Sequence, residues 1–186
     1  MDKTDIELIH ETVAGNMQSY DTLMKRYQES VYMIAYNFGR TKENALDISQ
    51  DVFLKVYKKM NTFKENSTFK SWVSKVAYNE SINWSKKNKK FLHQSDISDS
   101  HFDLETSHNP EEEILVNENK ALLLRCLFEL NTKYRLAVVL RYFENMPIKE
   151  IAASMECSEG VVKNMLFRSI QKLKKSLPTL QDGVQS

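Results

Sequence analysis

Residues 151–165, IAASMECSEGVVKNM, are the stretch that most restricts how this chain can fold. Two helical patterns meet there with almost no residues between them, as in a helix-turn-helix. That motif needs a small residue where its two helices cross, and Ala152 fills this position when Ile148 is counted as the first. The positions that should face the core hold Ile151, Met155, Cys157, Val162 and Met165. The spacing therefore predicts a helix-turn-helix that begins at Ile148.

One position of this pattern departs from the usual motif. The turn residue is Glu156, where glycine is favoured because the backbone there is left-handed. A residue other than glycine in that conformation costs about 1–2 kcal/mol. We expect the turn to form nevertheless, because the core-facing positions around it are all suitable.

The outward face of the second helix, which Ser158 should cap, predicts contact with DNA. Lysine and arginine neutralise phosphates, and arginine, asparagine and glutamine also read base edges in the major groove. The candidate residues on this face are Lys163, Asn164, Phe167, Arg168, Gln171 and Lys172. The plain alternative is an ordinary basic amphipathic helix. A single module of modest charge would bind DNA weakly at physiological salt, so something else must bring it there.

The rest of the chain also predicts helices. It holds only four Gly and three Pro among 186 residues, which argues against a β-sandwich. Apolar residues recur at helical spacing, with Ser19 expected to cap the second helix and Gly39 to end it. In the third helix one face should place Leu46, Val52, Phe53, Val56 and Met60 inward. The predicted helices span about 5–15, 20–38, 43–60, 71–88, 111–130, 133–145, 148–155 and 159–177.

Charge divides the chain into three parts, although the net charge is only +1. Residues 1–90 hold 15 Lys and Arg against 11 Asp and Glu, residues 91–113 hold none against 7, and residues 114–186 hold 11 against 7. The middle segment shows no periodic pattern and is poor in aliphatic residues. We therefore expect an all-α protein of two small helical domains, 1–90 and 114–180, joined by a flexible acidic linker, 91–113.

The remaining composition excludes several classes of protein. Cys126 and Cys157 make no disulfide framework, and neither lies at metal-ligand spacing from a histidine. The first residues do not resemble a signal peptide, and no apolar run is long enough to span a membrane. No phosphate-binding glycine loop is present. We expect a cytoplasmic protein that is not an enzyme and has no catalytic residues, metal or cofactor.

Three segments resemble the extracytoplasmic-function group of bacterial sigma factors, in the sigma-70 family. They are DISQDVFLKVY (47–57), FKENSTFKSWVSKVAYNESINW (63–84) and KYRLAVVLRYFENMPIKEIAASMECSEGVVKNMLFRSIQKLKKSL (133–177). The chain departs from the family at Asn83, often Asp, at Asn131, often Pro, at Glu156, often Gly, and at 160–165, where GVVKNM replaces Gly-Thr-Val-Lys-Ser-Arg. These differences bear on the promoter sequence rather than on the class.

The resemblance implies an alternative sigma factor that binds core RNA polymerase, directs it to promoters and helps to melt the −10 element. The beta-prime clamp and the beta flap are the implied polymerase partners, promoter DNA is the second partner, and an anti-sigma factor is a further one. Core-polymerase binding falls on Asp47, Gln50, Asp51, Phe53 and Leu54. Contacts to the −10 element fall on Phe63, Phe69, Lys70, Trp72, Lys75, Asn79, Asn83, Lys86 and Lys87, and contacts to the −35 element on Ser158, Lys163, Asn164, Phe167, Arg168 and Lys172.

Each of these assignments has a plainer alternative from the residues alone. Asp47 and Asp51 could form a solvated face with Asp51 paired to Lys55, and Phe69 and Trp72 could be core residues. The lysines after the fourth helix could serve only solubility, and the acidic linker could be a polyanion mimic or a simple tether. As a whole, the chain could also be a free-standing helix-turn-helix regulator without melting activity, or a helical adaptor that binds only protein.

Overall fold

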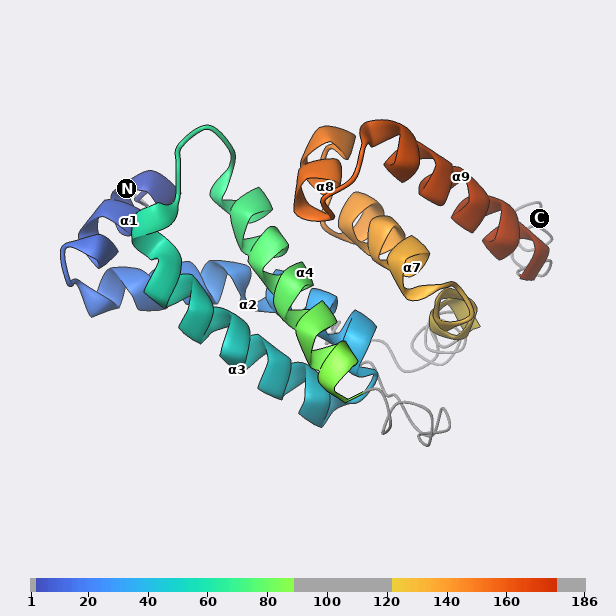
Figure 1. The fold of residues 1–186 in the computed structure, drawn as a ribbon, viewed down its shortest axis with the longest axis horizontal. Coiled ribbons are helices and arrows are strands. Elements are labelled where there is room, and N and C mark those ends of the chain that lie inside the picture. The colour runs from blue at the N-terminus through green and yellow to red at the C-terminus, as the bar shows by residue number, and fades with distance from the viewer. Residues whose placement is uncertain (1–2, 89–121, 177–186) are drawn as a thin grey trace, which may run out of the picture.

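The computed structural model describes residues 3–88 and 122–176, and in both ranges the ordered elements are helical turns without a strand. The N-terminal half contains α1 (Asp5–Val13), α2 (Met17–Gly39), α3 (Lys42–Lys59), a short 3-10 turn η1 (Met60–Thr62) and α4 (Phe69–Lys87). The C-terminal half contains α7 (Thr132–Val138), the π-helical turn η2 (Val139–Phe143), α8 (Ile148–Ser154) and α9 (Glu159–Ser176), after a helical stretch at residues 122–128. The predicted all-α class is confirmed (Figure 1). The predicted linker, residues 91–113, lies outside the described residues.

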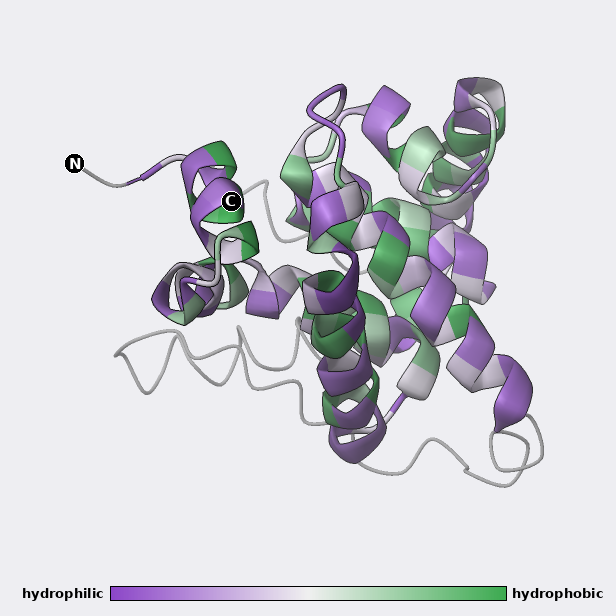
Figure 2. Cartoon of the chain, turned by 60° about the vertical axis from the view of Figure 1, so that its left-hand side comes forward, coloured by the Kyte–Doolittle hydropathy of each residue, from purple (hydrophilic) through white to green (hydrophobic). Residues whose placement is uncertain are grey.

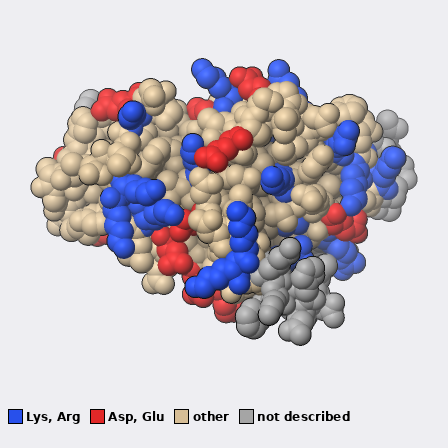
Figure 3. Space-filling model, in the orientation of Figure 1, with Lys and Arg blue, Asp and Glu red and all other residues tan. Residues whose placement is uncertain are grey.

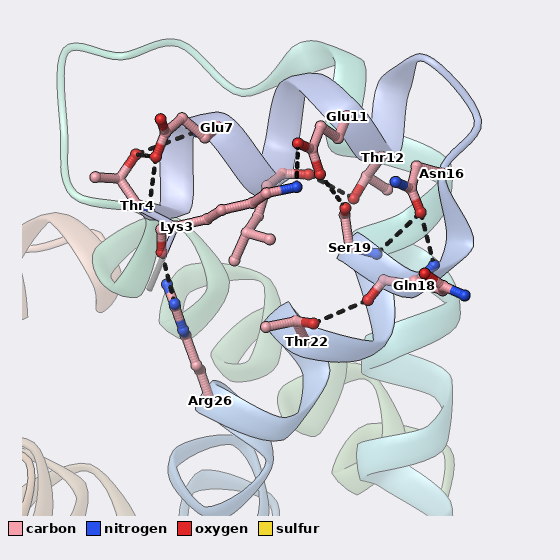
Figure 4. Close-up of polar contacts among 11 residues, drawn as sticks. Lys3, Thr4, Glu7, Glu11, Thr12, Asn16, Gln18, Ser19, Thr22 and Arg26 are labelled. Atoms are coloured by element: carbon pink, nitrogen blue, oxygen red, sulfur yellow. Dashed lines mark hydrogen bonds and ion pairs between the residues drawn. The ribbon is translucent and has the colours of Figure 1, made fainter. Parts of the chain in front are cut away.

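The first two helices begin at side-chain caps. The Thr4 hydroxyl accepts from the backbone N–H of Glu7, whose carboxylate accepts from the backbone N–H of Thr4, and this reciprocal pair starts α1 (Figure 4). The Asn16 side chain accepts from the backbone N–H groups of Gln18 and Ser19, and it starts α2 at Met17. The prediction that Ser19 caps this helix was therefore wrong by one turn. Its hydroxyl is bonded to the carboxylate of Glu11 instead (Figure 4).

The junction between α2 and α3 depends on a glycine, though not in the predicted way. Gly39 stays within the helix, and the left-handed residue that ends it is Arg40, with φ 64°. A Cβ at Gly39 would lie 2.8 Å from the Cβ of Asn44, closer than two carbons can approach. The Gly39 carbonyl accepts from the Asn44 side chain at 2.9 Å. Glycine is thus needed because α3 begins close against the end of α2.

The N-terminal core is formed by the facing sides of α1 to α4. Val31, Ala35, Ala45 and Val52 are completely buried, and apolar colour collects between the helices while their outer faces are hydrophilic (Figure 2). One inward prediction was wrong: Leu46 is 52% exposed, because Ala45 and Ile48, rather than Leu46, lie on the core stripe of α3.

The two halves of the chain pack against each other through α4 with α8 and α2 with α7 (Figure 1). Arg135 of α7 is buried at the second contact, and among residues 3–88 and 122–176 no carboxylate is paired with it. Its Nε donates to Asn37 Oδ1 at 2.6 Å and its Nη2 to the Asn37 carbonyl at 2.7 Å. Its Nη1 donates to the carbonyls of Phe128 and Leu130. Burial lowers the pKa of Arg135 to about 10, so the group stays charged near neutral pH.

Candidate nucleic-acid interface

The predicted helix-turn-helix is formed by α8 and α9. Its core-facing positions are buried as expected, except that Cys157 is only half-buried; the buried ones are Ile151, Ala152, Met155, Val162 and Met165. Glu156 adopts the left-handed turn conformation with φ 53°. The Ser158 hydroxyl accepts from the backbone N–H of Val161 at 3.3 Å, which confirms its capping role. The two helices therefore meet in the geometry that the spacing predicted.

The outer face of α9 presents all of the predicted −35 residues to solvent. The exposed positions are Ser158, Lys163, Asn164, Phe167, Arg168 and Lys172. Lys172 also donates to the backbone carbonyl of Glu129 at 2.7 Å, so part of its role is to hold α9 against the turn that follows the helical stretch at residues 122–128. Phe167 is 63% exposed and Val161 is 43% exposed. Sequence reasoning missed Val161, although its place one residue before a buried valine indicates an outward side chain.

An aromatic cluster lies where η1 meets α4. The rings of Phe63 and Trp72 are 5.7 Å apart, and each lies within 5.6 Å of the Phe69 ring. Tyr27 of α2, which sequence reasoning did not include, joins the cluster at 5.4 Å from Phe69. Phe69 is buried and serves the core, as its plainer alternative stated, whereas Phe63 and Trp72 are half-buried. Phe63, Trp72 and Tyr27 are therefore the members of the cluster that remain partly accessible to solvent.

A basic pocket opens beside Trp72. It has a volume of about 220 Å³ and is lined by Lys55, Lys59, Thr62, Trp72, Lys75, Val76 and Asn79. An aromatic ring beside lysine amines suits a nucleotide, since amines attract phosphate and the ring can stack on a base, although Lys55 and Lys75 are paired with Glu80 and Glu156 in this structure. Lys55 and Lys59 come from α3 and were missed by sequence reasoning, although their spacing of four residues places them on one helical face.

Three of the predicted −10 residues are bound to glutamates of the C-terminal half. Lys75 forms an ion pair with Glu156 at 3.1 Å, and Lys70 forms one with Glu144 at 2.9 Å. Asn79 is hydrogen-bonded to the Glu156 carboxylate. The bond from Lys75, its charge and the bond from Asn79 together hold the pKa of Glu156 below its usual value.

The other predicted −10 residues lie further along α4. Asn83 donates to Glu80 at 3.4 Å, and Lys86 and Lys87 are exposed in the last turn of the helix. The position of the two lysines at a helix C-terminus agrees with a favourable interaction with the helix dipole as well as with phosphate binding.

The predicted polymerase-binding face of α3 is free of internal pairing within the described residues. Asp47, Gln50, Asp51 and Leu54 are all exposed, and Lys55 pairs with Glu80 of α4 instead of Asp51. The plainer alternative of an Asp51–Lys55 pair is therefore not what the structure shows. Phe53 is half-buried, and its backbone carbonyl accepts from the Tyr20 hydroxyl at 2.7 Å.

Exposed apolar side chains extend this face of α3. Leu46, Leu54 and Tyr57 are 52%, 56% and 43% exposed. These three side chains leave apolar surface exposed beside the two aspartates.

The charged surface is mixed rather than uniformly basic. On the face that Figure 3 shows, acidic side chains lie between the groups of lysine and arginine. Across residues 3–88 and 122–176 no group of three or more His, Cys, Asp or Glu side chains is placed to hold a metal ion. No helix in the same ranges is long and apolar enough to cross a membrane.

Comparison with known proteins places both halves of the chain in one family. Residues 23–91 match sigma-70 region 2, and residues 120–173 match sigma-70, region 4. The RNA polymerase sigma-H factor of Pseudomonas aeruginosa is 27% identical over 183 residues and covers 95% of each chain. The ECF RNA polymerase sigma-E factor of Escherichia coli is 26% identical over 184 residues and covers 95% of this chain and 96% of its own.

Two solved structures have a similar fold. CnrH, in complex with the cytosolic domain of CnrY, superposes with a TM-score of 0.66 at 20% identity, covering 94% of this chain and 97% of its own. The sigma factor RpoE of Bartonella quintana, in complex with the anti-sigma factor NepR, gives a TM-score of 0.68 at 18% identity, covering 87% and 98%. Because two regions of one family occur in order and together span more than half of the chain, this protein belongs to the sigma-70 family and has the likeness of its extracytoplasmic-function group.

Proposed function

We propose that this chain is an alternative sigma factor that binds core RNA polymerase, directs it to specific promoters and helps to open the −10 element. One observation carries this proposal: an exposed recognition helix and a basic pocket beside a half-exposed Trp72 occur in the same chain. A protein that only binds duplex DNA needs the first feature but has no use for a pocket that could hold an unstacked base.

In this proposal α9 enters the major groove at the −35 element. Lys163 contacts phosphate, while Asn164 and Arg168 reach base edges. Val161 and Phe167 add apolar contact, for example with a thymine methyl group. The single module has few charges, so most of its affinity comes from the polymerase that carries it.

The pocket beside Trp72 acts at the −10 element. A base that leaves the duplex stacks on the exposed face of Trp72 or Phe63, which contributes about 1–3 kcal/mol per stacked base. Lys59 and Lys75 attract the neighbouring phosphates. This stacking stabilises the melted strand. Opening makes and breaks no covalent bond, so it requires no catalytic residue. We propose that the chain is not an enzyme.

The exposed face of α3 docks on the polymerase. Asp47 and Asp51 offer two carboxylates four residues apart, and Leu54 lies about one turn beyond Asp51 on the same face. A basic coiled coil such as the beta-prime clamp is the complementary surface, and the C-terminal half would meet the beta flap. We further propose that the chain works in the cytoplasm and that an anti-sigma factor restrains it, since one structural relative above, RpoE, was solved with the anti-sigma factor NepR.

Reconstituted transcription tests this function. Purified chain is added to core polymerase on a library of genomic fragments, and run-off transcripts are compared with those made by core alone. We expect discrete transcripts that depend on the chain. Unchanged non-specific transcription would reject the sigma function, and binding of the chain to DNA fragments without any new transcript would favour the free-standing regulator.

A further inference from the structure

The contact between α4 and α8 joins the predicted −10 surface to the chain's own acidic side chains. Three glutamates of the C-terminal half bind residues at the start of α4. Glu144 binds Lys70, Glu150 binds the capping residue Thr68, and Glu156 binds Lys75. Lys70 and Lys75 were predicted to bind DNA from their place in the sequence. Both amines are instead neutralised inside the molecule.

The first glutamate binds Lys70 through two groups. The Lys70 amine lies 2.9 Å from the Glu144 carboxylate and donates to the Glu144 backbone carbonyl at 2.7 Å. The Glu144 side chain is 12% exposed, so this pair is more shielded from solvent than an ordinary surface pair.

The second glutamate binds the N-terminus of α4. The Thr68 hydroxyl donates to Glu150 Oε2 at 2.7 Å while it caps the helix. Beside it, the Ser154 hydroxyl donates to the Ser71 carbonyl at 3.1 Å, and both serines are buried. These small side chains let α4 and α8 approach closely, and their polar groups are bonded across the contact.

The third glutamate is the unusual turn residue. Glu156 stands where glycine would be free of strain, and its left-handed backbone aims a carboxylate at Lys75 and Asn79. An anionic oxygen between an amine and an amide occupies the place that a DNA phosphate would take at the mouth of the Trp72 pocket. The strained residue therefore has a role in this contact that glycine could not fill.

We propose that these contacts form an interdomain latch, defined as Glu144, Glu150 and Glu156 with Lys70, Thr68 and Lys75, that holds the free chain closed and keeps its −10 surface from DNA. The inhibitory part of this inference rests on the proposed function; the closed arrangement does not. Opening occurs when a more favourable polyanion or the polymerase separates the halves. Raised salt weakens the latch as well, because the Lys75 and Glu156 side chains are 46% and 53% exposed and are screened.

Lysine acetylation of the free chain tests the latch. The measured quantity is the rate at which sulfo-N-hydroxysuccinimide acetate modifies Lys70, divided by the rate at Lys86, which is exposed and lies on the same helix. Glu156→Gln removes one latch contact five residues from Lys70. If the latch contacts form and break together, loss of the Glu156 contact also frees Lys70, although the Lys70–Glu144 pair itself is unaltered. The ratio of the two acetylation rates should then rise about two- to five-fold, as expected for one partly exposed ion pair.

Two further variants make the result decisive. Glu156→Gly removes the same carboxylate and also relieves the left-handed backbone, so it should fold and give the same rise. Glu159→Gln makes the same charge change three residues away, where the described residues include no partner for it, and should leave the ratio unchanged. An unchanged Lys70 ratio in both Glu156 variants, or an equal rise in the Glu159 variant, would overturn the latch.

A transcription measurement tests the inhibitory consequence separately. With limiting core polymerase, Glu156→Gln should form open promoter complexes faster than the unaltered chain, and equal or slower rates would contradict inhibition by the latch. Because acetylation uses neither polymerase nor DNA, its outcome is independent of the sigma function. Failure of all chain-dependent transcription would reject the proposed function and leave the closed arrangement standing.

Discussion

Replacing the buried Arg135 with methionine should destabilise the protein although it removes a charge from an apolar site. Arg135 is 2% exposed, and its four hydrogen bonds reach three backbone carbonyls and the Asn37 side chain. The ring of Phe128 also lies 4.4 Å below the guanidinium carbon. Methionine fills most of the space but offers no donor, so the carbonyls lose their partners.

The magnitude follows from the groups left behind. A buried carbonyl without a partner costs about 1–3 kcal/mol, and the three carbonyls together give the upper limit of the loss in the free energy of unfolding. The desolvation of a buried guanidinium, which methionine avoids, offsets several kcal/mol of this. We therefore expect a fall of about 2–4 kcal/mol in the free energy of unfolding.

A second variant separates the contribution of the Asn37 side chain from that of the other hydrogen bonds of Arg135. Asn37→Ala removes the Oδ1 acceptor of Arg135 and the Nδ2 donor to the Thr132 carbonyl, leaves the Asn37 carbonyl in place, and should cost about 1–3 kcal/mol. In the double variant the two effects should not add, because both remove the same bond between Nε and Oδ1. Urea unfolding followed by far-ultraviolet circular dichroism measures all three. A loss below about 0.5 kcal/mol for Arg135→Met, or simple additivity, would refute this reasoning.

Other expected outcomes concern the proposed surfaces. Trp72→Ala should spare core-polymerase binding but impair promoter opening, and normal opening in a permanganate assay would leave Trp72 with a core role only. Asp51→Arg should weaken co-elution with core polymerase and change the free energy of unfolding by less than about 0.5 kcal/mol, because the residue is exposed and Lys55 pairs elsewhere. Arg168→Ala should reduce −35 discrimination by about 1–3 kcal/mol in competition binding without changing the melting temperature. Burial raises the pKa of Tyr20 to about 12, so its stabilisation is complete below its unfolded value near 10 and is lost as pH rises toward 12; Tyr20→Phe should flatten that part of the stability profile.

The helices and the helix-turn-helix could be predicted because both depend on local periodicity. The core-facing positions of α8 and α9 follow from the 3.6-residue repeat, and the left-handed Glu156 follows from the motif's turn. The repeat was less decisive on α3, where Leu46 lies at the edge of the apolar stripe and the smaller Ala45 occupies its centre.

The contact between the two halves could not be predicted, because it depends on pairs far apart in sequence. Lys70 and Glu144 are separated by 74 positions, and Arg135 and Asn37 by 98. Each of these residues has an acceptable solvated environment when considered alone. Only the packing of α8 on α4 decides that a glutamate, rather than water or DNA, meets each lysine.

Permanganate probing of a chain-dependent promoter tests the central claim most directly, because it detects unpaired thymines. On a promoter identified by the run-off experiment, we expect thymines in the −10 element to become reactive only when core polymerase and this chain are both present. Specific binding of the two proteins at that promoter with every thymine protected would contradict the account.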